Sequence, residues 1–327
     1  GDIMEWLHIE PILDLIELVD TPSSLEKRLG FVMNSPLRHM FGQFQVPEEE
    51  ARRCLAAALS GEDDHSGLSK DCTELINYIG NIRKREKELR LFFGLMGKRE
   101  ASIREEAIKM AREYLPSSAS FEKLNVYFVP MPYNANADNL GVYFDPIFAM
   151  DIGLDAITGV MAHEAHHIGR NSVTSERLEF GDKPLETLAY RFMCLETEGI
   201  ANLVNDASQI PSLKRIALTR TKIMAEFEKH LELLQEVFLN LAGGVITDRE
   251  ARALMSRSWF TTGSLAPIGM KMAIEIENEF GKENLVKTVG DTVAFLKAYQ
   301  KVALKKNYYL LEDETFDNLE KLLKARQ

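Results

Sequence analysis

The chain has 327 residues, of which 45% are hydrophobic and 27% charged, values typical of globular proteins that exclude fibrous and disordered classes. No apolar run is long enough to cross a bilayer. The net charge of −11 argues against a surface for nucleic acid or anionic membranes, so we expect neither partner.

The compartment is predicted from the N-terminus and the cysteines. Gly1 and Asp2 are followed by acidic residues and lack the basic start and apolar core of a secretory signal. This favours the cytoplasm, with a signal already removed as the alternative. Cys54, Cys72 and Cys194 are too few and too scattered for a disulfide framework or a cysteine metal site. We interpret them as small buried hydrophobes in a reducing compartment.

Helical periodicity dominates the N-terminal part of the chain. A polar loop, GEDDHSG, is predicted at 61–67 between two of the helical segments. The predicted helices are 3–19, 47–60 and 69–115, the last with breaks near Gly94 and Gly97.

The pattern changes at Phe121. Residues 124–129 and 141–145 are rich in aromatic and β-branched residues, which predicts two strands that could form a hairpin with a long loop. Helices then return, and the first ends near Ile168, before Gly169. The predicted helices of this part are 152–168, 184–207, 213–241, 248–256, 265–280, 283–299 and 312–324. The sequence therefore predicts an α+β protein that is predominantly helical.

A metal-binding motif lies on the predicted helix 152–168. His163-Glu164-Ala165-His166-His167 is an HExxH sequence. Histidines four residues apart lie about 40° apart around a helix axis, so both rings can reach one ion. Glu164 can then act as general base toward a water held by the ion. The alternative is a surface helix with clustered histidines.

His166 creates an ambiguity, because it is also a helical neighbour of His163. The helical wheel places Glu164 inside the apolar face and His166 toward solvent. His163 and His167 lie at the border of that face. A carboxylate among apolar residues is costly without a partner, which a water on the ion supplies. We therefore prefer His163 and His167 as ligands and interpret His166 as a surface or supporting residue.

A zinc site needs a third protein ligand. No His-x-x-Gly-x-x-His continuation follows the motif, which disfavours the metzincin arrangement. The next predicted helix carries Glu196 and Glu198, and Glu196 lies deeper in its apolar face. Gly199 would let the two helices approach closely, and Asn202 could orient a histidine. Geometry alone leaves the two glutamates about equal.

HEAHH at 163–167 followed by TEGIANL at 197–203 resembles the gluzincin class of zinc peptidases, in which a Glu directly before Gly is the third ligand. Across about 121–207 the chain resembles a bacterial family of zinc-dependent peptidases with a strand pair, an HExHH helix and an EG-x-A helix in this order. The resemblance implies a zincin-like core with a small β-sheet beside the HExxH helix. It also implies one zinc ion per chain, held by His163, His167 and Glu198, with Glu164 as the catalytic residue.

The expected function is zinc-dependent hydrolysis of peptide bonds in a peptide or protein substrate, with Glu164 activating the water. Gluzincins usually add a Tyr or His that stabilises the oxyanion. Tyr299, Tyr308, Tyr309 and His230 are candidates, although a core or surface role is favoured for each. The GxMEN signature of M1-type aminopeptidases is absent, which slightly favours an endopeptidase or an enzyme for short peptides.

Three regions are expected: a helical region at 1–120, the zincin-like core at 121–208, and a helical region at 209–327 that closes the cleft, or one integrated domain. Two other functions are considered. One is an inactive zincin-fold binding protein. The other is a di-iron carboxylate protein, because Glu164-x-x-His167 fits its ligand element. That fold needs the element twice, and the further pairs, Glu5–His8 and Glu62–His65, lie near the terminus and in the polar loop.

Overall fold

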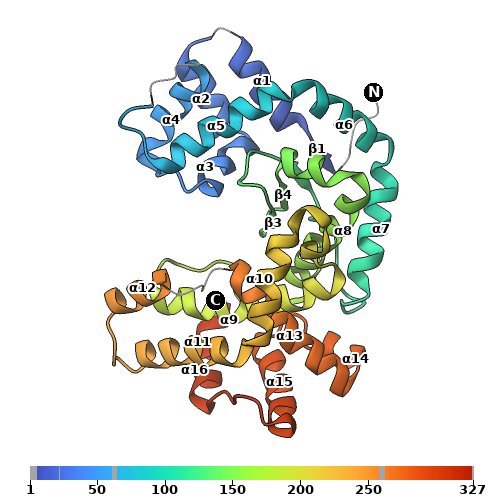
Figure 1. Ribbon diagram of the computed structural model, residues 1–327, viewed down its shortest axis with the longest axis vertical. Coiled ribbons are helices and arrows are strands. Elements are labelled where there is room, and N and C mark those ends of the chain that lie inside the picture. Colours follow the sequence, from blue (N-terminus) through green and yellow to red (C-terminus); the bar gives the residue numbers. More distant parts are fainter. Residues whose placement is uncertain (1–5, 22, 61–64, 258–261, 326–327) are drawn as a thin grey trace. The chain divides into compact units, whose positions relative to one another are not determined.

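The computed structural model describes residues 6–21, 23–60, 65–257 and 262–325 (Figure 1). The chain divides into two compact units. Unit 1 consists of Gly1–Glu105 and Lys123–Thr158, and unit 2 consists of Glu106–Glu122 and Gly159–Gln327. The predicted α+β class with predominant helix is confirmed. The division into three regions stays a prediction.

Unit 1 combines helices with a small sheet (Figure 1). Its helices are α1 (Glu10–Asp20), α2 (Leu25–Met33), the 3-10 turn η1 (Pro36–Arg38), α3 (His39–Gln43), α4 (Glu48–Ser60), α5 (Lys70–Lys84), α6 (Glu86–Lys98) and the first part of α7 (Glu100–Arg112). Its strands are β1 (Leu7–His8), β2 (Val126–Phe128), β3 (Ala135–Ala137) and β4 (Val142–Phe144), after which α8 (Pro146–Val173) begins.

The four described strands form one sheet in the order β1–β2–β4–β3. One face is apolar, because Val126 and Phe128 stand beside Val142 and Phe144 and all four side chains are fully buried. Phe93 of α6 packs on this face, with its ring centroid 5.3 Å from that of Phe128. The alternation of side chains along each strand thus gives unit 1 a core between the sheet and α6.

The predicted hairpin between 124–129 and 141–145 is wrong. β2 and β4 run parallel, and β4 pairs antiparallel with β3 instead. The connection between the two predicted strands contains β3, which pairs with β4 in the antiparallel direction. Two neighbouring strands that run parallel cannot be joined by a tight turn. In this sheet the chain reverses direction at β3, which lies between β2 and β4 in the sequence.

The first predicted helix, 3–19, is also wrong at its start. Leu7 and His8 pair with Val126 and Tyr127 as a strand, and residues 3–5 lie outside the described part of the chain. α1 begins at Glu10, with Pro11 in its first turn, where a missing N–H costs nothing.

The long stretch predicted at 69–115 forms three helices rather than one. The interruptions fall at Arg85 and Arg99, whose φ values are −105° and −111°, and not at Gly94 or Gly97, which lie inside α6. Arg85 donates to Asp151 at 2.9 Å and to Glu88 at 3.0 Å. The junction between α5 and α6 is therefore held by side-chain hydrogen bonds of Arg85, and the helix does not break at the glycines as the sequence predicted. Of the predicted loop at 61–67, residues 61–64 lie outside the described part of the chain.

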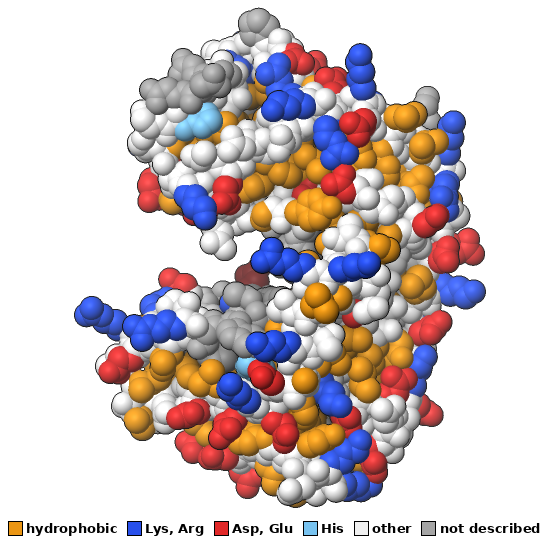
Figure 2. Space-filling view, viewed as in Figure 1, with side chains coloured by type: hydrophobic (Ala, Val, Ile, Leu, Met, Phe, Trp, Pro, Cys, Tyr) orange, Lys and Arg blue, Asp and Glu red, His pale blue; other side chains and the backbone are white. Residues whose placement is uncertain are grey.

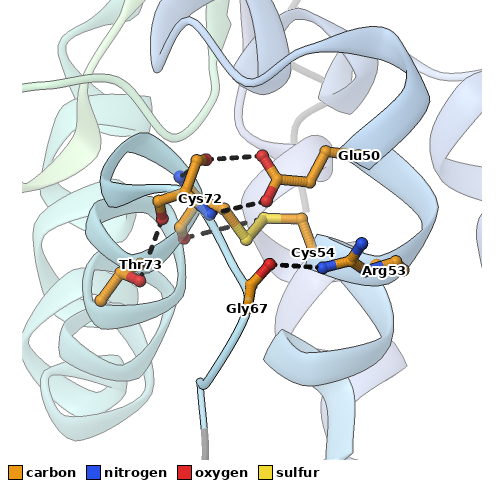
Figure 3. The surroundings of a disulfide bond; sticks show 7 residues. Glu50, Arg53, Cys54, Gly67, Cys72 and Thr73 are labelled. Atoms are coloured by element: carbon orange, nitrogen blue, oxygen red, sulfur yellow. Dashed lines mark hydrogen bonds between the residues drawn. A yellow bond between two sulfur atoms is a disulfide. The ribbon is translucent and has the colours of Figure 1, made fainter.

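Cys54 of α4 and Cys72 of α5 form a disulfide, with Cα atoms 5.6 Å apart (Figure 3). The interpretation of these two cysteines as unpaired is therefore wrong, whereas Cys194 is buried and is not part of this disulfide. The same junction is held by Glu50, which accepts hydrogen bonds from the Ser69 backbone at 2.7 Å and its hydroxyl at 2.5 Å. Disulfides persist in oxidising compartments and are rare in the cytosol, and the compartment of this protein stays a prediction.

Replacing both cysteines, Cys54→Ala with Cys72→Ala, is expected to lower the free energy of unfolding by about 3 kcal/mol, because the bond closes a loop with a sequence separation of 18. Urea unfolding of both proteins with and without reductant measures the effect. Reductant should destabilise only the wild type. Three titratable thiols in the denatured, unreduced wild type would contradict the disulfide.

Unit 2 is helical in its described residues. Besides the later parts of α7 and α8, its helices are α9 (Pro184–Val204), the 3-10 turns η2 (Ala207–Gln209) and η3 (Pro211–Leu213), α10 (Lys214–Ala225), α11 (Phe227–Ala242), α12 (Asp248–Arg257), α13 (Thr262–Phe280), α14 (Lys282–Val286), α15 (Thr292–Lys306) and α16 (Asp313–Leu323). α9 is the central helix and contacts α11, α12, α13, α15 and α16. Buried residues on several of its faces, among them Leu188, Phe192 and Leu195, explain this position.

Several helix boundaries of unit 2 differ from the prediction. The helix 213–241 is interrupted at Glu226, and 283–299 is divided between α14 and α15. α8 does not end near Ile168 but continues to Val173. Gly169 serves close packing rather than a helix end, because a Cβ there would lie 2.5 Å from Leu115 of the same unit.

Gly199 was expected to let the helices of the two motifs approach each other, but it faces α13. A Cβ at Gly199 would lie 2.5 Å from the carbonyl oxygen of Gly269, and one at Gly269 would overlap the backbone of Leu195. The two glycines therefore let α9 and α13 pack backbone to backbone.

The described residues contain no helix long and apolar enough to span a bilayer. On the face shown in Figure 2, basic and acidic side chains are interspersed.

Candidate metal centre

Two helices of unit 2 bring three potential metal ligands together. α8 carries His163 and His167, and α9 carries Glu198. The two Nε2 atoms are 3.2 Å apart. Glu198 Oε2 lies 3.2 Å from Nε2 of His163, and Oε1 lies 3.3 Å from Nε2 of His167. The side chains are only 13%, 13% and 20% exposed.

These separations are short enough for the three side chains to hold one zinc ion, with Glu198 facing the two histidines through different oxygens. Zinc bonds to histidine nitrogen and carboxylate oxygen measure about 2.0–2.1 Å, so adjacent ligand atoms of a tetrahedron lie about 3.3 Å apart. The donor set of two imidazoles and one carboxylate also matches a zinc site that keeps one position open. In the part of the chain that the structure describes, His163, His167 and Glu198 are the only group of this kind.

The tautomer of His163 is set by the end of α9. Its Nδ1 donates to the carbonyl oxygen of Asn205 at 3.1 Å, which leaves Nε2 free to bind a metal. Asn205 terminates α9 and packs on Gly159, one turn before His163 on α8. A Cβ at Gly159 would lie 2.9 Å from Cγ of Asn205. Sequence reasoning missed both residues, since nothing local marks them.

Glu164 is 5% exposed, and its Oε2 has no hydrogen-bond partner among the described residues. Burial raises the pKa of this carboxyl above its usual value, while the two neighbouring histidines act in the opposite direction. An unpaired buried carboxylate is costly, so this atom indicates a missing partner. A water on an ion held by the adjacent ligands would supply one.

The ligand charges are strongly coupled. Burial acts to lower the pKa of His163, but the carboxylates of Glu198 and Glu164 outweigh it and raise the pKa to about 9. For Glu198, burial acts in the raising direction, and His167 and His163 together hold its pKa well below the usual range. The site thus favours a bound positive charge, which a cation can supply.

His166 does not point to solvent, so that expectation is wrong. It is fully buried, and its Nε2 donates to the carbonyl oxygen of Tyr114 at 2.9 Å. Burial lowers its pKa to about 3, so the ring is neutral. The helical wheel failed here because α8 is covered on this side by the segment after α7, which belongs to the same unit.

The two competing glutamates lie in different environments. Glu196 is fully buried and accepts from Arg170 at 3.1 Å and from the Gly290 backbone at 2.8 Å. It therefore lies in an ion pair, and Glu198 lies against the histidines. Asn202, expected to orient a histidine, instead donates to the backbone oxygen of Glu198 at 2.7 Å.

The aromatic candidates for oxyanion stabilisation are bonded elsewhere. Tyr299 is fully buried and donates to the carbonyl oxygen of Tyr309 at 3.1 Å. The hydroxyl of Tyr309 accepts from Gln235 at 2.7 Å, and the ring of Tyr308 packs edge-on against Phe227. These contacts favour a core role for Tyr299 and a structural role for the two partly exposed tyrosines.

Gly159→Ala is expected to weaken zinc binding by about 10- to 100-fold, because the added methyl displaces Asn205 and with it the hydrogen bond that orients His163. Chelator competition measures the affinity. Gly94→Ala is the matched control, since a Cβ there meets nothing within 4 Å. Equal affinities for both variants and the wild type would contradict this role of Asn205.

Comparison with known proteins agrees with this chemistry. No curated protein and no solved structure matches the chain. A family model described as "Putative zinc dependent peptidase" matches residues 32–308, which include the whole HExxH motif and the third ligand candidate. The predicted resemblance to a family of zinc-dependent peptidases is thus confirmed, and the gluzincin class stays a prediction. Because the match covers most of the chain, the chain belongs to the family that carries this description.

Proposed function

We propose that this protein is a zinc-dependent hydrolase of peptide bonds that uses one zinc ion per chain. The observation that carries the proposal is the approach of two imidazole nitrogens and one carboxylate to within 3.2–3.3 Å of each other. His163, His167 and Glu198 would hold the ion. The description of the family supports the same chemistry.

Zinc, when bound, supplies an acidified water and polarises a substrate carbonyl. Glu164 acts as the general base: its buried carboxylate takes a proton from the attacking water and returns it to the leaving amine. The raised pKa of Glu164 suits a general base, because a more basic carboxylate accepts a proton more readily.

The metal content of the purified protein tests the proposal. We expect close to one zinc per chain in the wild type and almost none in Glu198→Ala by inductively coupled plasma mass spectrometry. Glu283→Ala, whose side chain is 88% exposed in the same unit, is the control and should keep its zinc. Chelator-sensitive cleavage in a peptide library completes the test. Two irons per chain, or no metal under any loading condition, would overturn the proposal.

The two alternative functions make different predictions in this experiment. A di-iron protein needs a second ligand cluster, but Glu5 and Glu62, which the further Glu-x-x-His pairs require, lie outside the described residues. A binding protein without activity would hold zinc and cleave no peptide of the library.

A further inference from the structure

A buried charged cluster lies beside the candidate metal centre in unit 2. Arg170, Glu176 and Glu196 form it and are called the Arg170 cluster. The Arg170 side chain is 1% exposed and that of Glu196 is fully buried. Arg170 donates through Nε to Glu196 at 3.1 Å and through Nη2 to Glu176 at 2.5 Å.

The cluster joins the two helices that carry the ligands. Arg170 lies three residues after His167 on α8, which is less than one helical turn. Glu196 lies two residues before Glu198 on α9. The Arg170–Glu196 bond is therefore a direct link between α8 and α9 close to the ligand atoms.

The far side of the cluster is fixed to Gly290, between α14 and α15, and to Thr292, the first residue of α15. The second oxygen of Glu196 accepts from the backbone of Gly290 at 2.8 Å. Glu176 accepts from the hydroxyl of Thr292 at 2.9 Å and from its backbone N–H at 3.2 Å. Both oxygens of Glu196 thus have donors. If α8 moved relative to α9, a buried charge would lose its partner, which is strongly unfavourable.

We propose that Arg170 and Glu196 are positioning residues that set the separation of α8 and α9 and thereby the spacing of the zinc ligands. The inference rests on the proposed zinc site. A functional constellation must be held to within about 0.5 Å, and an apolar contact allows larger sliding than a pair of charged hydrogen bonds. Without the link, His163 and His167 keep their place on α8, but Glu198 moves relative to them.

Glu196→Gln is the sharpest test variant, because it keeps the size of the side chain. Its amide offers one acceptor oxygen, while two donors, Arg170 Nε and the Gly290 N–H, face the position. One of the two bonds must be lost. Arg170→Lys is the second variant: it keeps the charge but not the two-pronged geometry of the guanidinium.

The control is Gln235→Met, which removes a different buried polar centre of unit 2. Gln235 is 1% exposed and bonds Tyr309, Glu312 and Thr315, none of which is a ligand candidate. Two readouts are used at a temperature where circular dichroism shows each variant folded. They are the zinc affinity by chelator competition and the visible absorption spectrum of the cobalt(II)-loaded protein.

We expect zinc affinity to fall by about 10- to 100-fold in Glu196→Gln and Arg170→Lys, with a shifted cobalt spectrum, and to change less than about twofold in Gln235→Met. An unchanged affinity and spectrum in both test variants would overturn the positioning role alone. So would an equal loss in Gln235→Met, which would mean a general effect of stability. A wild type that binds neither metal would overturn the proposed function and this inference together.

Discussion

Glu164→Gln is expected to lower the rate of peptide hydrolysis by about 10²- to 10⁴-fold while the zinc content stays unchanged. The substitution keeps the size of the side chain and its place in α8 but removes the proton acceptor. Because Glu164 is not among the three converging ligand atoms, the affinity for zinc should not fall. Turnover of a peptide selected from the library, with metal content measured on the same sample, gives both numbers.

A second substitution at Glu164 tests whether the carboxylate is needed for proton transfer or only for filling the space in the site. Glu164→Asp keeps an acceptor but withdraws it by one methylene, so an intermediate rate is expected. Glu283→Gln, at the exposed position of the same unit, should match the wild type. A Glu164→Gln protein that retains the wild-type rate would show that another group accepts the proton.

The part of the site that sequence could predict is the part whose geometry is local. His163 and His167 share a face of one helix whatever the rest of the fold does, because helical spacing alone fixes their relation. The choice between Glu196 and Glu198 depends on which carboxylate lies beside the two histidines. This depends on tertiary packing, which the sequence pattern does not show. The pattern correctly placed Glu196 in a buried position, but its partner there is Arg170.

The same distinction explains what failed in the fold. The helical and extended segments were recognised from periodicity, but the sheet order depends on β3, a strand of three residues that no pattern marks. The partner of Gly199 was misassigned because a glycine signals close approach without saying which helix approaches. His166 was misassigned because the helical wheel assumes that one side of α8 is exposed to solvent, whereas the segment at Tyr114 covers that side.

Asp145 provides the second prediction with a large effect. It lies at the start of α8 in unit 1, is fully buried, and accepts hydrogen bonds from the Ile147 backbone at 2.8 Å and from the Tyr78 hydroxyl. Its Oδ2 has no hydrogen-bond partner in the described part of the chain. Burial raises the pKa of Asp145 from 3.8 to about 7, although backbone N–H donors act against this rise.

Asp145 should therefore make the wild type less stable as the pH rises. A carboxyl with a higher pKa in the folded state than in the unfolded state binds its proton more tightly when folded, so its contribution is complete below about pH 4 and is lost as the pH passes about 7. The loss amounts to at most about 4 kcal/mol. Asp145→Asn is neutral at every pH and should not show it.

Urea unfolding of wild type and Asp145→Asn between pH 4 and pH 8, in the presence of a chelator, measures this term. Glu176, whose pKa burial raises to about 7, titrates in both proteins, so the difference between them isolates Asp145. Asp155→Asn, which lies in α8 beyond the kink at Gly153 and has a 99% exposed side chain, is the control and should follow the wild type throughout. The stability of Asp145→Asn relative to the wild type should thus increase as the pH rises. If the wild type instead gained stability relative to Asp145→Asn as the pH rose, hydrogen bonding to the ionised carboxylate, rather than burial, would dominate at this helix start.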